Sequence, residues 1–309
     1  MRTAMPTQVQ STPTIAVIAP GAMGAAVGHR LAKSGCAVLT NLDGRSPASV
    51  ERARAAGMHD TPLSEIAQRA QWVLSILPPS SALAFAQAFR DAYSASAAGG
   101  SAKEGLTFVD CNAVSPETAR KIAGVFEGSA IRFIDAGIVG RPPQDGYDPA
   151  FYASVDPREP ELLEGFVQLG KEWGLRVVPL TGEGAGIGDA SALKMSYALH
   201  MIDMGDAANA SSPATAQALL HELADSQPVF LERMTKSIPG MLPKAYRWVG
   251  EMEEISSFVR RGLGEGEAHI HEGFAHLYDR IEKALPEGED VGVLKKFVED
   301  AKAVIQKSK

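Results

Sequence analysis

The sequence predicts an α/β fold, in which a doubly wound parallel sheet is followed by an all-helical C-terminal domain. Up to about residue 180, short apolar runs alternate with amphipathic segments of ten to fifteen residues, which is the pattern of βαβ units. A turn rich in small residues follows the first apolar run and opens the first helical segment. After residue 189 the chain shows helical patterns and prolines but no convincing strand.

The individual elements follow from these patterns. Strands are predicted for six apolar runs: TIAVIA, CAVLTN, WVLSIL, LTFVDCN, IRFIDAGIV and RVVPL. WVLSIL and the IRFIDA part of the fifth run lack polar alternation, which predicts that they are buried. The helices predicted between them are GAMGAAVGHRLAKSG, SPASVERARAAG, PSSALAFAQAFRDAY, SPETARKIAGVFE and ELLEGFVQLGKEW. Ser46 before Pro47 and Ser115 before Pro116 are predicted N-caps. Residues 94–105 are rich in small residues and predict a loop.

Three segments are predicted along the chain: a frayed tail over 1–13, a dinucleotide-binding-type domain over 14–182 and a helical domain over 183–309. The opening residues lack an apolar stretch, so a signal peptide is not expected. The first helix of the second domain, about 187–209, is apolar around most of its circumference, which predicts burial. Prolines are expected to break the later helices: Pro213, Pro228, Pro239, Pro243 and Pro286.

Composition narrows the class of function. The net charge of −7 does not favour a nucleic-acid partner or an anionic membrane surface. No run approaches the roughly 18 apolar residues of a membrane helix. The two cysteines, Cys36 and Cys111, suit a reduced protein, and we expect a cytoplasmic location.

The stretch APGAMG after the first strand contains the last two glycines of a G-x-G-x-x-G dinucleotide fingerprint. Gly21 is placed where the backbone must approach a pyrophosphate, and Gly24 where helix and strand pack closely. Ala19 replaces the first glycine, which only makes the turn. A purely structural turn is the alternative, but the strand before, the helix after and the βα alternation favour nucleotide binding.

The end of the second strand reads NLDGRSP, where a dinucleotide site recognises the adenosine ribose. An acid there favours NAD and an arginine favours NADP, and this chain offers both Asp43 and Arg45. Because Arg45 and Ser46 together suit a 2′-phosphate, we expect a preference for NADP, with NAD possible.

Four motifs occur in the order and approximate spacing of the β-hydroxyacid dehydrogenases: APGAMG, DCNAVSPETA, DAGIVGRPP and GIGDASALKMSYA. The chain resembles this family, which includes 3-hydroxyisobutyrate and 6-phosphogluconate dehydrogenases, and within it a less characterised 6-phosphogluconate-dehydrogenase-like branch. The resemblance implies a Rossmann-type domain followed by a helical one, and a homodimer. It also implies a nicotinamide cofactor held by residues at the ends of the first three predicted strands: Ala19, Pro20, Gly21, Ala22, Met23, Gly24, Asn41, Arg45, Ser46, Leu77 and Pro78.

Lys194 matches the catalytic lysine of that family and is the expected proton shuttle. From the residues alone, a lysine on this apolar helix can equally extend its amine to solvent. The motifs that contact the substrate in that family differ in this chain, so the resemblance does not identify the substrate. The expected substrate contacts are Asn112, Gly137, Gly140, Arg141 and Tyr197. A surface role for Arg141 and a packing role for Tyr197 are the alternatives.

The segment HEGFAH resembles a zinc motif, but its histidines are five residues apart. That spacing puts His271 and His276 about 140° apart around a helix, so no metal is predicted. We expect these residues at a junction between a loop and a helix.

Together these observations predict an NAD(P)-dependent oxidoreductase that acts on a small hydroxy acid or related carbonyl. Two alternatives remain. One is an imine reductase or reductive aminase, which Tyr197 favours and Lys194 opposes; the other is an NADP-binding regulatory protein without turnover. The large apolar residues after Pro213 support a homodimer. In such a dimer, Trp248 or His271 can approach the Lys194 cleft of the other chain.

Overall fold

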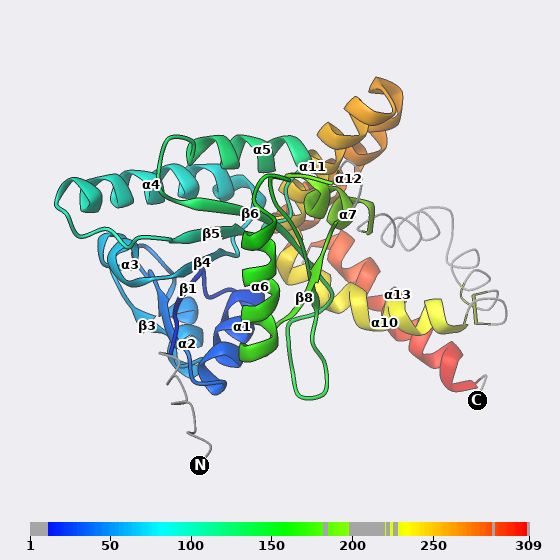
Figure 1. Cartoon of the computed structure of the whole chain (residues 1–309). Coiled ribbons are helices and arrows are strands. Elements are labelled where there is room, and N and C mark those ends of the chain that lie inside the picture. Colours follow the sequence, from blue (N-terminus) through cyan, green and yellow to red (C-terminus); the bar gives the residue numbers. More distant parts are fainter. Residues whose placement is uncertain are drawn as a thin grey trace, which may run out of the picture. The chain divides into compact units, whose positions relative to one another are not determined.

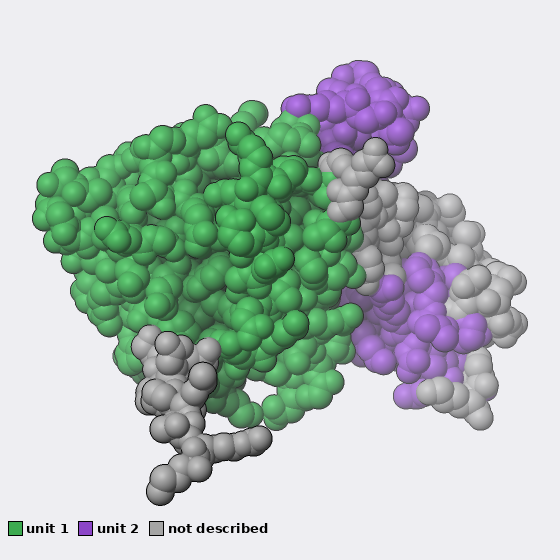
Figure 2. Space-filling view, in the orientation of Figure 1, with its two compact units in different colours: residues 1–197 green, residues 198–309 purple. Residues whose placement is uncertain are grey.

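The computed structural model describes residues 12–181, 185–197, 220, 223–224, 228–285 and 288–307. The chain divides into two compact units, 1–197 and 198–309 (Figure 2). The predicted domain boundary, between 182 and 183, lies before this division. Helix α7 (Asp189–Tyr197) falls in the first unit because it packs against strands of the sheet. Of the predicted tail, residues 1–11 lie outside the described residues.

The first unit contains an eight-stranded sheet with the order β3-β2-β1-β4-β5-β6-β7-β8. All neighbouring strands run parallel except β6 and β7, which are antiparallel. The strands are β1 (Thr14–Ile18), β2 (Ala37–Thr40), β3 (His59–Asp60), β4 (Trp72–Ser75), β5 (Thr107–Asp110), β6 (Arg132–Val139), β7 (Ala150–Ser154) and β8 (Arg176–Pro179).

Helices cover both faces of this sheet (Figure 1). On one face, α1, α2 and α6 enclose an apolar core that includes Val27, Leu31 and Phe166. On the other face, α3, α4 and α5 pack around a cluster of aromatic rings that includes Phe89 and Phe108. The helices are α1 (Ala22–Lys33), α2 (Pro47–Ala55), α3 (Leu63–Arg69), α4 (Pro79–Ala98), α5 (Pro116–Val125) and α6 (Pro160–Trp173). The predicted doubly wound fold is confirmed.

Several local predictions need correction. Strands β3 and β7 were not predicted, and β7 makes the sheet mixed rather than wholly parallel. Strand β3 is only two residues long and both are exposed, so the sequence shows no apolar run there. Helix α3 was also missed, and α4 continues to Ala98, inside the loop predicted for 94–105, because its alanines and serines are compatible with a helix.

Both predicted N-caps are confirmed. The hydroxyl of Ser46 accepts a hydrogen bond from Ser49 N at 3.3 Å, and Pro47 is the first residue of α2. The hydroxyl of Ser115 accepts from Thr118 N at 3.3 Å, with Pro116 in the equivalent place of α5. These caps set where the two helices begin, close to the carboxyl ends of β2 and β5.

The described part of the second unit is helical. Helix α11 packs against α12, and α10 against α13. The elements are α10 (Pro228–Met241), η1 (Leu242–Lys244), α11 (Ala245–Gly262), α12 (Glu265–Lys283) and α13 (Glu289–Lys307). Pro239 lies inside α10 rather than ending it, and the helix stops at Met241. Of the helix predicted over 187–209, the part after Tyr197 lies outside the described residues. None of the described helices is both long and apolar enough to span a membrane.

Candidate functional site

The candidate site lies where the strand order reverses, at the carboxyl ends of β1 and β4. Open α/β sheets bind their ligands at such a point. Residues 19–21 connect β1 to α1, and residues 76–78 connect β4 to α4. The two connections touch, since Ala19 N donates to the Ile76 carbonyl at 3.3 Å. The fold thus brings two of the predicted cofactor segments together.

The two glycines of the first turn differ in what surrounds them. A Cβ at Gly24 would overlap the carbonyl oxygen of Ala19, so glycine is needed for α1 to lie this close to the end of β1. A Cβ at Gly21 would meet no described atom within 4 Å. Gly21 N donates to Ala19 O at 2.9 Å, which closes the turn without a first glycine. Open space beside the N-terminal end of α1 is the arrangement that a pyrophosphate requires.

The segment after β2 presents the groups predicted to recognise the ribose. Asp43, Arg45 and Ser46 are exposed. The Asn41 side-chain amide donates to Asp43 Oδ2 at 2.9 Å and to the Thr61 carbonyl at 3.3 Å. Asn41 therefore holds the Asp43 carboxylate, while Ser46 also caps α2.

Arg52 of α2 joins this region, although the sequence did not indicate it. Its Nε donates to the carbonyl of Pro20 at 2.9 Å, and its Nη2 donates to Ser49 Oγ at 2.9 Å. A guanidinium therefore lies against the glycine turn itself. The sequence arguments for the cofactor considered only residues in or next to the turn after a strand, and Arg52 reaches the glycine turn from within α2.

Asn112 is buried, with 1% of its surface exposed. Its Oδ1 accepts from Leu77 N, and its Nδ2 donates to Ser75 Oγ at 2.9 Å and to the Asp110 carboxylate. The side-chain oxygen and nitrogen of Asn112 thus link the connection after β5 to the end of β4 and to the connection that follows it. In this structure Asn112 has a structural role, and contact with a substrate stays a prediction.

Polar side chains cross the sheet in one row near the carboxyl ends of its strands. Ser75, Asp110, Asp135 and Ser154 are register partners on β4, β5, β6 and β7. All four are buried, and the Asp135 side chain is fully so. The neighbouring Cys111 thiol has its pKa raised by burial and by the charges of the two aspartates. Two buried carboxyl groups, Asp110 and Asp135, are therefore register partners inside the sheet here.

Asp135 binds the first turn of α7. Its Oδ2 accepts from Gly188 N at 3.0 Å, from Ser191 N at 3.1 Å and from Ser154 Oγ at 3.2 Å, and its Oδ1 accepts from Ser191 Oγ at 2.7 Å. Burial raises the pKa of the Asp135 carboxyl, while the hydrogen bonds from Ser191, Ser154 and Gly188 oppose that rise. The sequence did not indicate this network, because Asp135 is more than fifty residues away along the chain from its partners Gly188 and Ser191.

Lys194 lies on α7, half-buried, beside the predicted substrate residue Gly137. A Cβ at Gly137 would be 2.8 Å from the Ala190 carbonyl oxygen and 3.0 Å from Lys194 Cβ. The structure therefore brings Gly137 and Lys194 together, and their roles in substrate binding and proton transfer stay predictions. Tyr197 ends α7, and its side chain lies outside what the structure describes.

Gly140 and Arg141 lie in the hairpin between β6 and β7, where their described partners belong to the same hairpin. Gly140 has a φ of +125°, and a Cβ there would overlap the Tyr147 hydroxyl. The Arg141 guanidinium lies 5.0 Å from the centre of the Tyr147 ring, and Arg141 N donates to Tyr147 Oη at 3.2 Å. Their roles as substrate contacts stay predictions.

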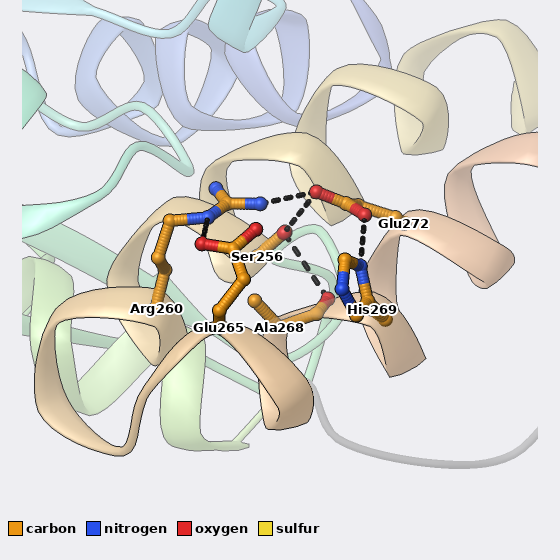
Figure 3. Close-up of polar contacts among 6 residues, drawn as sticks. All are labelled: Ser256, Arg260, Glu265, Ala268, His269 and Glu272. Carbon is orange, nitrogen blue, oxygen red and sulfur yellow. Dashed lines mark hydrogen bonds and ion pairs between the residues drawn. The ribbon is translucent and has the colours of Figure 1, made fainter.

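The histidine segment of the second unit lies within helix α12, not at the predicted junction of loop and helix. His271 is buried, whereas His269 is exposed and its Nδ1 lies 2.7 Å from Glu272 Oε2. Arg260 forms ion pairs with both Glu265 and Glu272 (Figure 3). These two glutamates and His269 have ligand atoms close enough for a metal ion, but the Arg260 guanidinium already supplies the positive charge between the carboxylates.

Two family models match the chain. Residues 14–152 match the NAD binding domain of 6-phosphogluconate dehydrogenase, and residues 210–281 match a domain of unknown function, DUF1932. No curated protein matches the sequence significantly.

Solved structures of the same fold cover nearly the whole chain. A conserved protein of unknown function, described as similar to 3-hydroxyacid dehydrogenases, is 24% identical with a TM-score of 0.57, over 89% of this chain and 99% of its own. A 3-hydroxyisobutyrate dehydrogenase from Salmonella typhimurium is 14% identical with a TM-score of 0.54, over 92% and 99%. An imine reductase variant from Myxococcus stipitatus, in complex with NAD+, is 16% identical with a TM-score of 0.51, over 93% and 100%.

At these identities the solved structures establish the fold, while the family models identify the domains. The glycine turn, the strand order and the matched range 14–152 agree on where the nucleotide half begins. The chain thus resembles the NAD binding domain of 6-phosphogluconate dehydrogenase over residues 14–152 and a DUF1932 domain over residues 210–281, and it shares its fold with a protein described as similar to 3-hydroxyacid dehydrogenases.

Proposed function

We propose that this protein is an NAD(P)-dependent oxidoreductase that interconverts a small hydroxy acid and the related carbonyl compound, with Lys194 as general acid and base. One observation carries the proposal. Lys194 belongs to the same compact unit as the glycine turn, because α7 packs on β6 and β7. The lysine and the nucleotide turn are therefore held by one sheet.

The residues present fit a dinucleotide. Gly24 brings α1 against the end of β1, and Gly21 leaves space where the phosphates would approach the amides of Ala22 and Met23. The turn is completed by Ala19 and Pro20, and Leu77 and Pro78 follow the neighbouring strand. When bound, the nicotinamide ring supplies the hydride acceptor or donor.

The lysine then has to move one proton. In the oxidising direction its amine accepts the proton of the substrate hydroxyl, and in the reducing direction its ammonium returns a proton to the carbonyl oxygen. Gly137 beside Lys194 lacks a side chain that would occupy this space. Lys194 is half-buried as a residue, and charges act more strongly in a medium of lower dielectric constant than bulk water.

NADP is the proposed preference, with NAD as the second cofactor. Arg45 and Ser46 are exposed where the 2′-phosphate would lie, and Arg52 adds a second guanidinium between this segment and the glycine turn. Asn41 hydrogen-bonds to Asp43, which reduces the repulsion that this carboxylate would exert on a phosphate.

The experiment that tests the function is a substrate panel with the purified chain. NADPH or NADH is supplied with aldehydes, keto acids and cyclic imines, and NADP+ or NAD+ with 3-hydroxy acids, while reduced-nicotinamide absorbance is followed. Turnover with hydroxy or keto acids supports the proposal, provided that Lys194→Met abolishes most of it. Turnover with imines alone supports the imine reductase alternative. Cofactor binding without any turnover supports the regulatory alternative.

We also propose that the protein works as a homodimer in the cytoplasm. Its two described cysteines are free and buried, which suits a reducing compartment. The helical unit carries large apolar side chains that are exposed, among them Val229 at 79% and Leu263 at 71%. Light scattering at low micromolar concentration should give twice the single-chain mass of 32.7 kDa. A monomer with full activity would contradict the dimer.

A further inference from the structure

Two residues of one strand hold helix α7 in place. Asp135 and Gly137 are two positions apart on β6, so both face the same side of the sheet. Asp135 binds the first turn of α7, and Gly137 lies against the next turn. One contact is electrostatic and the other steric, and both lie between β6 and the helix that carries Lys194.

The electrostatic contact uses both oxygens of the carboxylate. Its oxygens accept from Gly188 N, Ser191 N, Ser191 Oγ and Ser154 Oγ, and an ionised carboxylate offers about four such lone-pair positions. Two of the donors are main-chain amides at the N-terminal end of α7, where the helix dipole favours a negative charge. The helix start is therefore bound by charge, not only by apolar packing.

The steric contact at Gly137 sets how closely α7 can approach β6. At Gly137 a methyl group would be 2.8 Å from the Ala190 carbonyl oxygen and 3.0 Å from Lys194 Cβ, shorter than ordinary van der Waals contact. Ser191 and Lys194 are three residues apart, so they lie one above the other on a single face of α7. Fixing Ser191 therefore fixes the rotation of the helix at Lys194.

We propose that Asp135 is a positioning residue for the proposed reaction. Through Ser191 and Gly188 it sets the axial position and rotation of α7, and hence the place of the Lys194 amine relative to the nucleotide turn. This inference rests on the proposed role of Lys194 in proton transfer. Ser154 belongs to the same hydrogen-bond network, because its Oγ donates to Asp135 and accepts from Ala190 N at 3.2 Å.

The most direct variant is Asp135→Asn, which keeps the shape of the side chain and removes the charge. The new NH2 group then faces donors, so contacts to the first turn of α7 are lost rather than replaced. Ser191→Ala is the milder variant, since it removes only the hydroxyl donor and leaves the main-chain amide. If Asp135→Asn does not fold, Ser191→Ala carries the test.

Hydrogen exchange of the full-length protein measures the positioning directly. In Asp135→Asn, amides of residues 188–194 should exchange roughly tenfold faster or more, because charged hydrogen bonds are lost, while residues 14–33 keep their rates. Phe166→Leu is the matched control, since Phe166 is fully buried on the opposite face of the sheet from Asp135. Exchange in 188–194 within twofold of wild type, or an equal acceleration in a Phe166→Leu protein of the same Tm, would overturn the inference.

Kinetics then separate positioning from simple loss of stability. Asp135→Asn should lower kcat by roughly 10² with little change in the cofactor Kd, because a misplacement of about 1 Å can cost that much. In a Lys194→Met background the same substitution should lower the residual kcat by less than twofold. A full further loss in that background would refute action through Lys194. Should wild type turn over no substrate, the proposed function fails, and the exchange result still decides the positioning role.

Discussion

The two halves of the carboxyl edge of the sheet are built in different ways. Around β1 and β2, the site consists of a short turn, open space beside Gly21 and exposed side chains such as Arg45. Around β5 and β6 the polar groups are buried: Asn112 binds Asp110, and Asp135 binds the start of α7. The first half offers main chain to a ligand, and the second uses its side chains to hold the fold.

This difference predicts how each half responds to substitution. Changes in the β1–β2 half should alter cofactor binding with little effect on stability, Gly24 excepted. Changes in the β5–β6 half should affect stability and catalysis together, because a buried polar group left without its partner costs more than the bond it made. Four experiments test this contrast, in order of expected effect.

The largest effect is expected for Lys194→Met, which removes the amine and keeps most of the stem that packs beside Gly137. The kcat should fall by about 10² or more, the usual contribution of positioned acid–base catalysis. Steady-state kinetics measure this, and Kd for NADPH should stay near wild type. Lys171→Met is the control, because Lys171 is exposed on α6. Activity within twofold of wild type in Lys194→Met would remove Lys194 from the mechanism.

Gly24→Ala should destabilise the fold, because its methyl group would overlap the Ala19 carbonyl. We expect a loss of about 1–3 kcal/mol in the free energy of unfolding, measured by urea titration. Gly21→Ala should leave that free energy nearly unchanged and weaken cofactor binding. If Gly21→Ala binds NADPH and NADH as tightly as wild type, the turn does not hold the pyrophosphate.

Asn112→Ala should lower the free energy of unfolding by about 1–3 kcal/mol, since Leu77 N and Ser75 Oγ lose a buried partner. Asn41→Ala is the matched change in the other half, where the amide partner is exposed, and it should cost less than about 1 kcal/mol. Thermal unfolding of both variants decides the comparison. Equal losses would show that the two halves do not differ in this respect.

Arg45→Ala should weaken NADP roughly tenfold, the worth of about one charged hydrogen bond, and NAD hardly at all. Arg54→Ala removes the same charge from α2, where Arg54 is exposed and paired with Glu51. Titration of cofactor fluorescence gives both affinities. An equal loss for NADP and NAD, or tighter binding of NAD by wild type, would point to Asp43 as the residue that reads the ribose.

Much of the first half was predictable because its determinants are local. Gly21 and Gly24 lie within one turn, and Ser46 caps a helix that starts at the next residue, as Ser115 does after β5 in the other half. The pattern of apolar runs and amphipathic segments also predicted six of the strands and five of the helices between them, with α3 missed. Such features depend on neighbours a few residues away, which the sequence places side by side.

The rest was decided by tertiary contacts. Strand β7 pairs antiparallel with β6 only because the hairpin after Val139 returns the chain. Arg52 reaches Pro20 across 32 residues, and Asp135 reaches Gly188 across 53. Spacings of this size carry no periodic signal. A buried aspartate becomes an anchor for Lys194 only when the sheet brings its carboxylate to the N-terminal end of α7, since the hydrogen bonds that stabilise the charge come from a distant part of the chain.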